Sequence, residues 1–306
     1  YINSLIQVFY SITSFREAII SCDLQLDPNA GRNNPNNSLF QLKKLFLNLK
    51  HTQDEYIDTK DFCRHYDTSP LSEREQKDID EFFIDILDRI ETHLQPTSHS
   101  DLIKYFFQGK NTDKLEFQSE CKCIKTNTHP FYSVQLQVKD KTSLQESLES
   151  LIQGEQMSGD NQIHCNQCNT KHDALKRQFF STLPRVFVFV LKRFEYNVAT
   201  MQRFKLNDHY QFPTEIDMSP YMDDNNNKKV DCMYKLKGIV IHIGSVDGGH
   251  YYAITYDGEQ WFEFNDTKVN EFKLENLESE AFGGFYDRMN NKSGVSRIAI
   301  VFIDFI

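Results

Sequence analysis

One histidine of this sequence lies in a segment that could support nucleophilic catalysis. Two stretches carry the pattern: Gly248-Gly249-His250-Tyr251-Tyr252 and Trp261-Phe262-Glu263-Phe264-Asn265-Asp266. These stretches predict two strands joined by a turn at Asp257-Gly258. In such a hairpin, Asn265 or Asp266 lies next to His250, within reach of its Nδ1 atom. A histidine held by an amide or a carboxylate is the base of a Cys-His or Ser-His pair. Taken alone, the segment is more often a surface hairpin with an incidental histidine.

The residues beside His250 are candidates for contact with a substrate. Two glycines before the histidine allow a tight backbone turn and leave one face of the imidazole open. Tyr251 and Tyr252 are neighbours on a strand and therefore face opposite sides, one inward and one lining a cleft. We include Gly249 and Tyr251 among the predicted substrate-binding residues, and we interpret His242 as a structural residue of a strand.

A second group of residues has the spacing of a metal site. Cys165-Asn166-Gln167-Cys168 has the C-x-x-C spacing of half a zinc site, and Cys121-Lys122-Cys123 precedes it by about forty residues. The C-x-C spacing is unusual, and free buried thiols are the alternative interpretation. If a zinc ion binds, Cys121, Cys123, Cys165 and Cys168 are its predicted ligands. Its role would be to fasten this segment, and no cofactor is expected for catalysis.

Apolar residues recur at helical spacing in the first part of the chain and at strand spacing in the later part, and this change predicts an α+β fold. Apolar residues recur at helical spacing over 39–49 and 73–94, with Ser72 as a plausible N-cap of the second helix. Residues 144–152 form another short amphipathic pattern. The later part predicts strands at 131–138, 186–191, 234–243, 250–256, 260–264 and 298–303. A helical first hundred residues and a β-rich remainder are typical of α+β domains.

Composition excludes several classes of protein. The 25 Phe and 14 Tyr among 306 residues are far more than a disordered chain carries, so a sizeable core can form. A net charge of -10 argues against nucleic acid and anionic membranes and suits a basic partner, although solubility alone explains bulk charge equally well. No apolar run approaches the ~20 residues that span a bilayer. Seven cysteines, an odd number, favour reduced thiols and a cytosolic or nuclear location.

Four further segments, in order along the chain, extend the histidine pattern into a family resemblance. They are Tyr1-Ile2-Asn3-Ser4-Leu5-Ile6-Gln7, Gln76-Lys77-Asp78-Ile79-Asp80-Glu81-Phe82-Phe83, Leu183-Pro184-Arg185-Val186 and Leu191-Lys192-Arg193-Phe194. Together with the histidine segment they resemble the ubiquitin-specific protease family over essentially the whole chain. The segment from Lys205 to Tyr221 is closest in appearance to the large fat-facets-like members.

This resemblance implies a papain-like fold of thumb, palm and fingers. The helical thumb would comprise residues 1–107, the fingers residues 108–182 and the β-rich palm residues 183–306. His250 would be the general base, Asn265 the third member of the triad, and Asp266 a neighbour that assists or substitutes for it. In the family, acidic residues at the positions of Asp78 and Glu81 meet the arginines of the ubiquitin tail, which carboxylates recognise bidentately.

The resemblance also implies an activity, the hydrolysis of the bond after the C-terminal glycine of ubiquitin in its conjugates with proteins. The nucleophilic cysteine of the family immediately precedes a tyrosine like Tyr1, so this sequence begins one residue after it. We interpret the chain as a piece of a larger enzyme that is cut at that point. A ubiquitin-binding module without activity is the alternative, and an unrelated interaction domain fastened by zinc is a third hypothesis.

Overall fold

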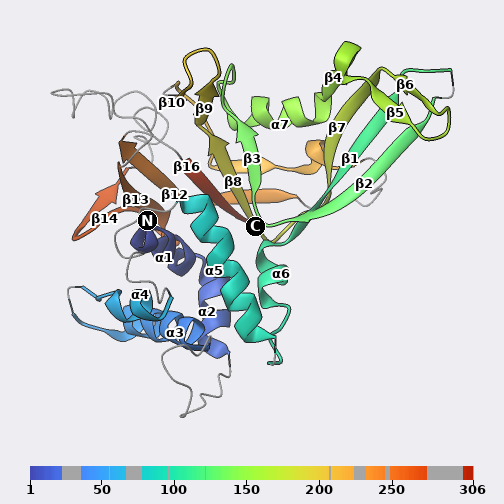
Figure 1. Cartoon of the computed structure of the whole chain (residues 1–306). Helices are drawn as coiled ribbons and strands as arrows, with labels where there is room; N and C mark the ends of the chain where they lie inside the picture. Colours follow the sequence, from blue (N-terminus) through green and yellow to red (C-terminus); the bar gives the residue numbers. More distant parts are fainter. Residues whose placement is uncertain are drawn as a thin grey trace.

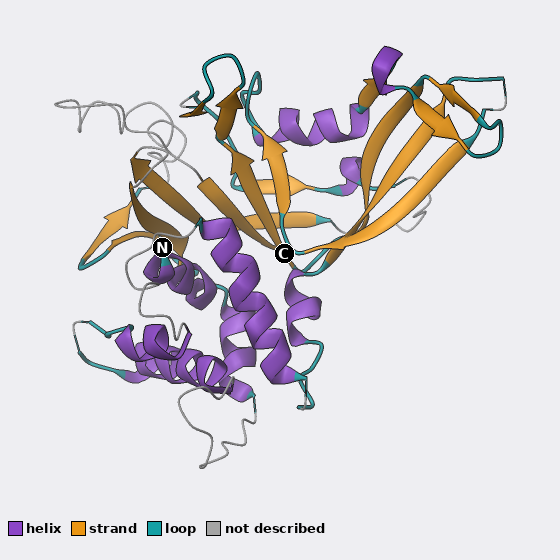
Figure 2. Cartoon of the chain, viewed as in Figure 1, coloured by secondary structure: helices purple, strands orange, loops and turns teal. Residues whose placement is uncertain are grey.

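The computed structural model describes residues 1–22, 36–54, 56–66, 78–95, 97–120, 122–206, 208–223, 232–244, 249–273 and 299–305. Helices and strands segregate along the chain, as expected for the α+β class (Figure 2). The helices before the first strand are α1 (Ile2–Ser11), α2 (Thr13–Ser21), α3 (Asn36–His51), α4 (Lys60–Tyr66), α5 (Ile79–Leu94) and α6 (Leu102–Phe107). None of the described helices is both long enough and apolar enough to cross a bilayer.

Helix α5 begins later than the sequence pattern predicts. Asp78 is its N-cap, with an extended backbone and a side chain that accepts a hydrogen bond from the Asp80 amide at 3.0 Å. The prediction of Ser72 as the cap was therefore wrong, and residues 67–77 lie outside the described residues. The predicted apolar stripe is confirmed, since Ile79, Phe82, Phe83, Ile86, Leu87 and Ile90 are all buried.

A long antiparallel sheet extends to one side of the helices (Figure 1). Its strands lie in the order β2-β1-β7-β4. Their bounds are β1 (Gly109–Phe117), β2 (Ile124–Phe131), β4 (Glu155–Met157) and β7 (Ala174–Thr182). A two-stranded hairpin, β5 (Ile163–Cys165) and β6 (Thr170–His172), lies at its far end. Helix α7 (Leu144–Gln153) confirms the short amphipathic helix, and a 3₁₀ turn follows at Gly159–Asn161.

The central sheet has eight strands. Seven lie in the order β15-β14-β13-β12-β16-β8-β3, and β11 (Glu215–Asp217) pairs with β12. The bounds are β3 (Val134–Gln137), β8 (Val186–Lys192), β12 (Met233–Gly244), β13 (Gly249–Tyr256), β14 (Trp261–Asn265), β15 (Lys268–Phe272) and β16 (Ala299–Phe305). Only the β3–β8 pair among these is parallel. A separate hairpin, β9 (Phe194–Asn197) and β10 (Gln202–Lys205), follows β8, and a second 3₁₀ turn lies at Ser219–Tyr221.

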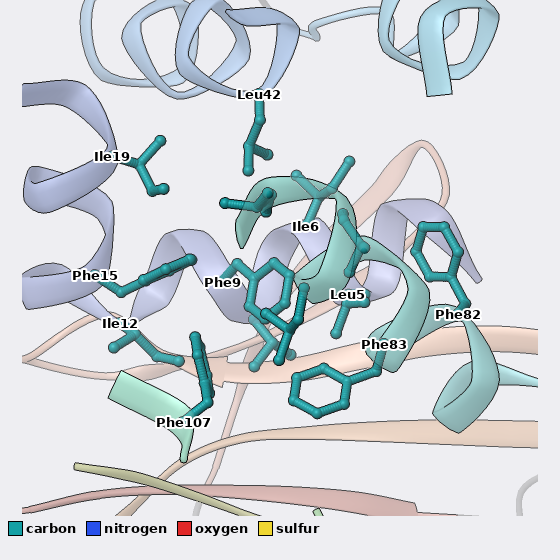
Figure 3. Packing of buried hydrophobic residues seen from close by; sticks show 14 of the residues in the cluster. Leu5, Ile6, Phe9, Ile12, Phe15, Ile19, Leu42, Phe82, Phe83 and Phe107 are labelled. Atoms are coloured by element: carbon teal, nitrogen blue, oxygen red, sulfur yellow. The ribbon is translucent and has the colours of Figure 1, made fainter. Parts of the chain in front are cut away.

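The sheet is buried on both faces, which explains the continuous apolar run of β8. Val186, Val188 and Val190 face the helices, whereas Phe187, Phe189 and Leu191 face the opposite core. On the helical side, Phe9 of α1, Phe83 of α5 and Phe107 of α6 contact one another (Figure 3). The ring centroid of Phe9 lies 6.1 Å from that of Phe83 and 5.8 Å from that of Phe107. Helix α1 packs directly on β12 and β13, and so ties the start of the chain to the strand of His250.

Candidate active site

His250 and Asn265 are brought together by the hairpin that the sequence predicts. The turn between β13 and β14 is closed by a hydrogen bond from the Asp257 amide to the Gln260 carbonyl (3.2 Å), with Gly258 at a φ of +119°. The ladder pairs Ala253 with Phe264, so the start of β13 lies beside the end of β14. There the His250 Nε2 atom is 2.7 Å from the Asn265 Oδ1 atom.

The ring nitrogen that makes this contact differs from the prediction. The sequence argument placed Asn265 at Nδ1, but the partner is Nε2, which lies further from the backbone and so spans the distance to the neighbouring strand end. An amide oxygen only accepts, so Nε2 carries the proton and the Nδ1 lone pair is left to take one from a substrate or nucleophile. In the neutral ring, this is the tautomer that lets Nδ1 act as a general base.

Asp266 is more distant and more exposed than Asn265. Its Oδ2 atom lies 3.7 Å from the His250 Nε2 atom, and its side chain is 64% exposed. Asp266 lies in the turn between β14 and β15, next to the paired residues Asn265 and Lys268. Its φ of +53° is a left-handed conformation, which aspartate tolerates better than most residues. Water screens such an exposed charge, so Asn265 is the residue better placed to orient His250.

The amino group of Tyr1 lies close to this pair. Helix α1 contacts β12, β13 and β14, and the N-terminus lies beside them in Figure 1. The Tyr1 nitrogen is largely buried and lies within electrostatic reach of Asp266 and Cys63. The Tyr1 ring packs edge-on against Phe82 of α5, 5.0 Å between centroids. A group attached to the Tyr1 nitrogen would therefore enter the surroundings of His250 and Asp266.

An acidic groove of about 960 Å³ runs between α5 and the end of β8. It is lined by Asp78, Asp80, Glu81, Ile84, Asp85, Asp88, Arg89, Gln135, Val190, Leu191, Lys192, Arg193 and Phe194. Both acidic residues that the sequence singled out are among them, with Glu81 exposed and Asp78 engaged as the helix cap. The sequence argument missed Asp85 and Asp88, whose signal was their recurrence at helical spacing after Glu81.

Asp80 takes part in the groove differently from its neighbours. It accepts hydrogen bonds from Ser133 (3.1 Å), just before β3, and from Gln135 (2.9 Å), within β3, and these bonds fasten α5 to that strand. Burial raises the pKa of Asp80 against the effect of these two donors. Its oxygens are therefore already occupied, and Glu81 is the better placed of the two to meet an incoming cation.

Tyr251 and Gly249 are occupied by contacts within the protein. Tyr251 is only 7% exposed and belongs to the helical core, whereas Tyr252, 2% exposed, belongs to the opposite core. The two tyrosines face opposite sides as predicted, but both are buried, so the prediction that one of them lines a cleft was wrong. Burial and the charge of Asp78 raise the pKa of Tyr251, against a hydrogen bond from the backbone of Ile79. Tyr251 thus joins the strand of His250 to the start of α5. At Gly249 a Cβ atom would lie 2.2 Å from the His242 Nε2 atom.

Three cysteine sulfurs form a cluster at the far end of the long sheet. The Sγ atoms of Cys123, Cys165 and Cys168 lie within 4.8 Å of one another, and the described cysteines form no disulfide. Cys121 lies outside the described residues. The Asn169 amide donates to the Cys165 carbonyl (2.8 Å), which turns the chain tightly around the C-x-x-C segment. Zinc-bound thiolates lie ~2.3 Å from the metal, so three sulfurs at this spacing fit three of its four ligand positions.

The α+β fold and the His250–Asn265 contact are consistent with the papain-like cysteine protease class, to which the matching family belongs. The family described as Ubiquitin carboxyl-terminal hydrolase matches residues 1–291, and the chain belongs to this family. The chain is 31% identical to human Ubiquitin carboxyl-terminal hydrolase 34 over 95% of its own length. It is 30% identical to Ubiquitin carboxyl-terminal hydrolase puf of Drosophila melanogaster over 93%, and 31% identical to the probable hydrolase FAF of the same organism over 81%.

These matches confirm the resemblance drawn from the motifs, including the one to fat-facets-like members. The chain spans only a small part of these relatives, 9% of the human protein, 8% of puf and 10% of FAF.

Proposed function

We propose that the chain is the catalytic domain of a deubiquitinase that hydrolyses the bond after the C-terminal glycine of ubiquitin in protein conjugates. The observation that carries this proposal is the 2.7 Å contact between His250 and Asn265 beside the amino group of Tyr1. The nucleophile would be a cysteine directly before Tyr1 in the natural protein. A base oriented by an amide is the arrangement of Cys-His-Asn proteases.

In the proposed reaction His250 transfers protons while the sulfur carries the acyl group. The Nδ1 atom takes the thiol proton, and the thiolate attacks the carbonyl carbon of the terminal glycine to give a tetrahedral oxyanion. Collapse of this intermediate breaks the C–N bond, and the imidazolium gives its proton to the leaving amine. Water then attacks the thioester with His250 again as the base, which releases ubiquitin and restores the thiol.

We further propose that the acidic groove receives the tail of ubiquitin. Glu81 and Asp78 would meet its arginines, because carboxylates bind a guanidinium bidentately. Glycine residues at the end of the tail suit a narrow cleft, where any side chain would clash. Ubiquitin and ubiquitinated proteins are thus the proposed partners, and the reduced thiols favour a cytosolic or nuclear location.

This proposal also assigns the thumb, the fingers and the palm of the family to three parts of the chain. Residues 1–107 would form the thumb, 108–182 the fingers and 183–306 the palm, with the cleft between thumb and palm. A zinc ion held by Cys123, Cys165 and Cys168, with Cys121 as the fourth proposed ligand, would fasten the tip of the fingers. The spacing of the three sulfurs supports this site.

The test is to extend the protein upstream through its natural residues and mix it with ubiquitin that carries a C-terminal electrophile. Intact mass spectrometry should show one ubiquitin added per chain. His250→Ala should slow the addition, whereas His51→Ala, at the exposed end of α3, should not. Ubiquitin binding without an adduct would instead identify an inactive binding module, and the absence of both would leave the unrelated interaction domain.

A further inference from the structure

The buried His242 and the half-buried Lys205 form a pair beside the strand of His250 that has no part in the reaction above. The Nζ atom of Lys205, at the end of β10, is 2.9 Å from the Nδ1 atom of His242 in β12. His242 is only 4% exposed. The carbonyl oxygens of His242 and Gly244 lie 3.5 Å from the same Nζ atom, so the lysine side chain is held at the end of β12.

This contact favours the tautomer of His242 in which Nδ1 accepts a hydrogen bond from the lysine. Lysine donates and never accepts when charged, so Nδ1 is the acceptor and the ring proton lies on Nε2. Burial, followed by the charges of Lys205 and His250, lowers the pKa of His242 to about 4, which keeps the ring neutral at pH 7. Burial, with the charge of Arg193, lowers the pKa of Lys205 to about 7, and its amino group donates an N–H in either protonation state.

The opposite edge of the His242 ring supports the residue before His250. His242 pairs with Tyr251 across the β12–β13 ladder, with ring centroids 4.6 Å apart. Its Nε2 atom occupies the space where a Cβ atom of Gly249 would stand, at 2.2 Å. The backbone carbonyl oxygen of Ile243 lies nearly as close to the same point, at 2.3 Å. The His242 ring and the β12 backbone therefore pack together against the start of β13, next to His250.

The lysine also connects His250 to the acidic groove. Lys205 pairs with Phe194 in the β9–β10 hairpin, and its Nζ atom lies 5.3 Å from the centre of the Phe194 ring. Phe194 lines the groove and faces His242, with 6.3 Å between ring centroids. Groove, lysine, histidine and the start of β13 thus form one continuous set of contacts.

We propose that Lys205 and His242 are positioning residues for His250, with Lys205 fixing the ring of His242 and His242 fixing the start of β13. The catalytic meaning of this inference rests on the proposed function. Neither residue touches the reacting atoms, so the pair should affect the chemical step and leave ubiquitin binding intact. A base displaced by about 1 Å costs about 100-fold in rate, which sets the scale of the expected effect.

The first measurement uses the chain alone and needs no activity. Nitrogen NMR of histidine-labelled protein should show the His242 ring neutral at pH 7, protonated on Nε2 with Nδ1 as acceptor. Lys205→Met should shift these two resonances and those of His250. Lys139→Met is the matched control, because Lys139 contacts the same hairpin through Glu195 (3.2 Å) on an exposed surface. A His242 ring protonated on Nδ1 in the wild type would overturn the proposal whether or not any variant folds.

The second measurement is the hydrolysis of a fluorogenic ubiquitin substrate by the upstream-extended protein. Lys205→Met should lower kcat about 10- to 100-fold with KM within about twofold, and Lys139→Met should leave both unchanged. Unchanged kcat in an active Lys205→Met protein would refute the positioning role while the hydrolase function stands. An inactive wild type would refute the hydrolase function, and the NMR result alone would then decide whether the pair fixes β13.

Discussion

His250 is oriented by an amide, because its Nε2 atom lies 2.7 Å from Asn265 and 3.7 Å from the exposed carboxylate of Asp266. The two candidates follow each other in the sequence but differ in what they can do. Asn265 ends β14 and holds the ring by a direct hydrogen bond. Asp266, in the turn beyond it, can act only through a charge that water screens.

This difference predicts unequal effects of the two alanine substitutions. Asn265→Ala should lower kcat about 100-fold, because the imidazole loses the bond that fixes its orientation and tautomer. Asp266→Ala should cost less than about fivefold. Both would be measured on the upstream-extended protein with a fluorogenic ubiquitin substrate. If Asp266→Ala were the more damaging change, the role of third triad member would pass to Asp266.

The two functions of Asp78 can be separated experimentally. Asp78→Ala removes both the α5 cap and a charge of the groove, and loss of the cap costs about 1 kcal/mol of stability. Asp78→Asn keeps a capping oxygen and removes only the charge. We expect Asp78→Asn and Glu81→Lys each to weaken ubiquitin binding about tenfold by calorimetry, with thermal unfolding lowered only in Asp78→Ala. If the three variants bound ubiquitin as tightly as the wild type does, the start of α5 would not be part of the proposed ubiquitin site.

The cysteine cluster predicts a metal content. Protein purified under reducing conditions should contain one zinc per chain by elemental analysis, and a chelator should lower its melting temperature. Cys165→Ser should abolish the zinc, whereas Cys63→Ser, on α4 and outside the cluster, should retain it. A metal-free protein with an unchanged melting temperature after chelation would show that the thiols are simply free.

Buried histidines predict a loss of stability in acid. Burial lowers the pKa of His93, in the last turn of α5, to about 4, below the ~6.5 of an unfolded chain. The unfolded state therefore binds a proton that the folded state refuses, and stability falls as the pH drops from about 6.5 towards 4. Between pH 7 and pH 5 this histidine should contribute about 2 kcal/mol of that loss.

Urea unfolding of the wild type and His93→Gln at the two pH values isolates this contribution. The variant should lose about 2 kcal/mol less than the wild type on going from pH 7 to pH 5. Parallel losses in the two proteins would show that His93 is not neutral in the folded state at pH 5.

Local patterns predicted the elements well and their long-range relations less well. The stripe of α5, the two-sided burial of β8 and the 251–264 hairpin each leave a periodic signal in a single segment. The alternation over 131–138 concealed a change of strand, because Phe131 ends β2 and Val134 begins β3, which pairs with a different sheet. Ser72 and Asp78 are both good caps, and spacing alone does not choose between them.

The relations that position the base left no local signal. Lys205 and His242 meet from strands and lie 37 residues apart in the sequence. Lys205 opens the segment that resembles fat-facets-like members, but nothing in that segment indicates a contact with His242. Which nitrogen of His250 meets Asn265 depends on how the His250 ring is rotated toward the neighbouring strand. Such contacts follow from the packing of the whole sheet, which periodicity does not encode.

The packing of α1 on β12 and β13 has a consequence for synthesis on the ribosome. Helix α1 is translated before the strands that cover Leu5, Val8 and Phe9, which follow it by more than two hundred residues. Until then its apolar face has no sheet to pack on, and closing so large a loop is slow. Chaperones that hold nascent apolar segments should therefore engage the early helices, and release them only once the strand of His250 has been made.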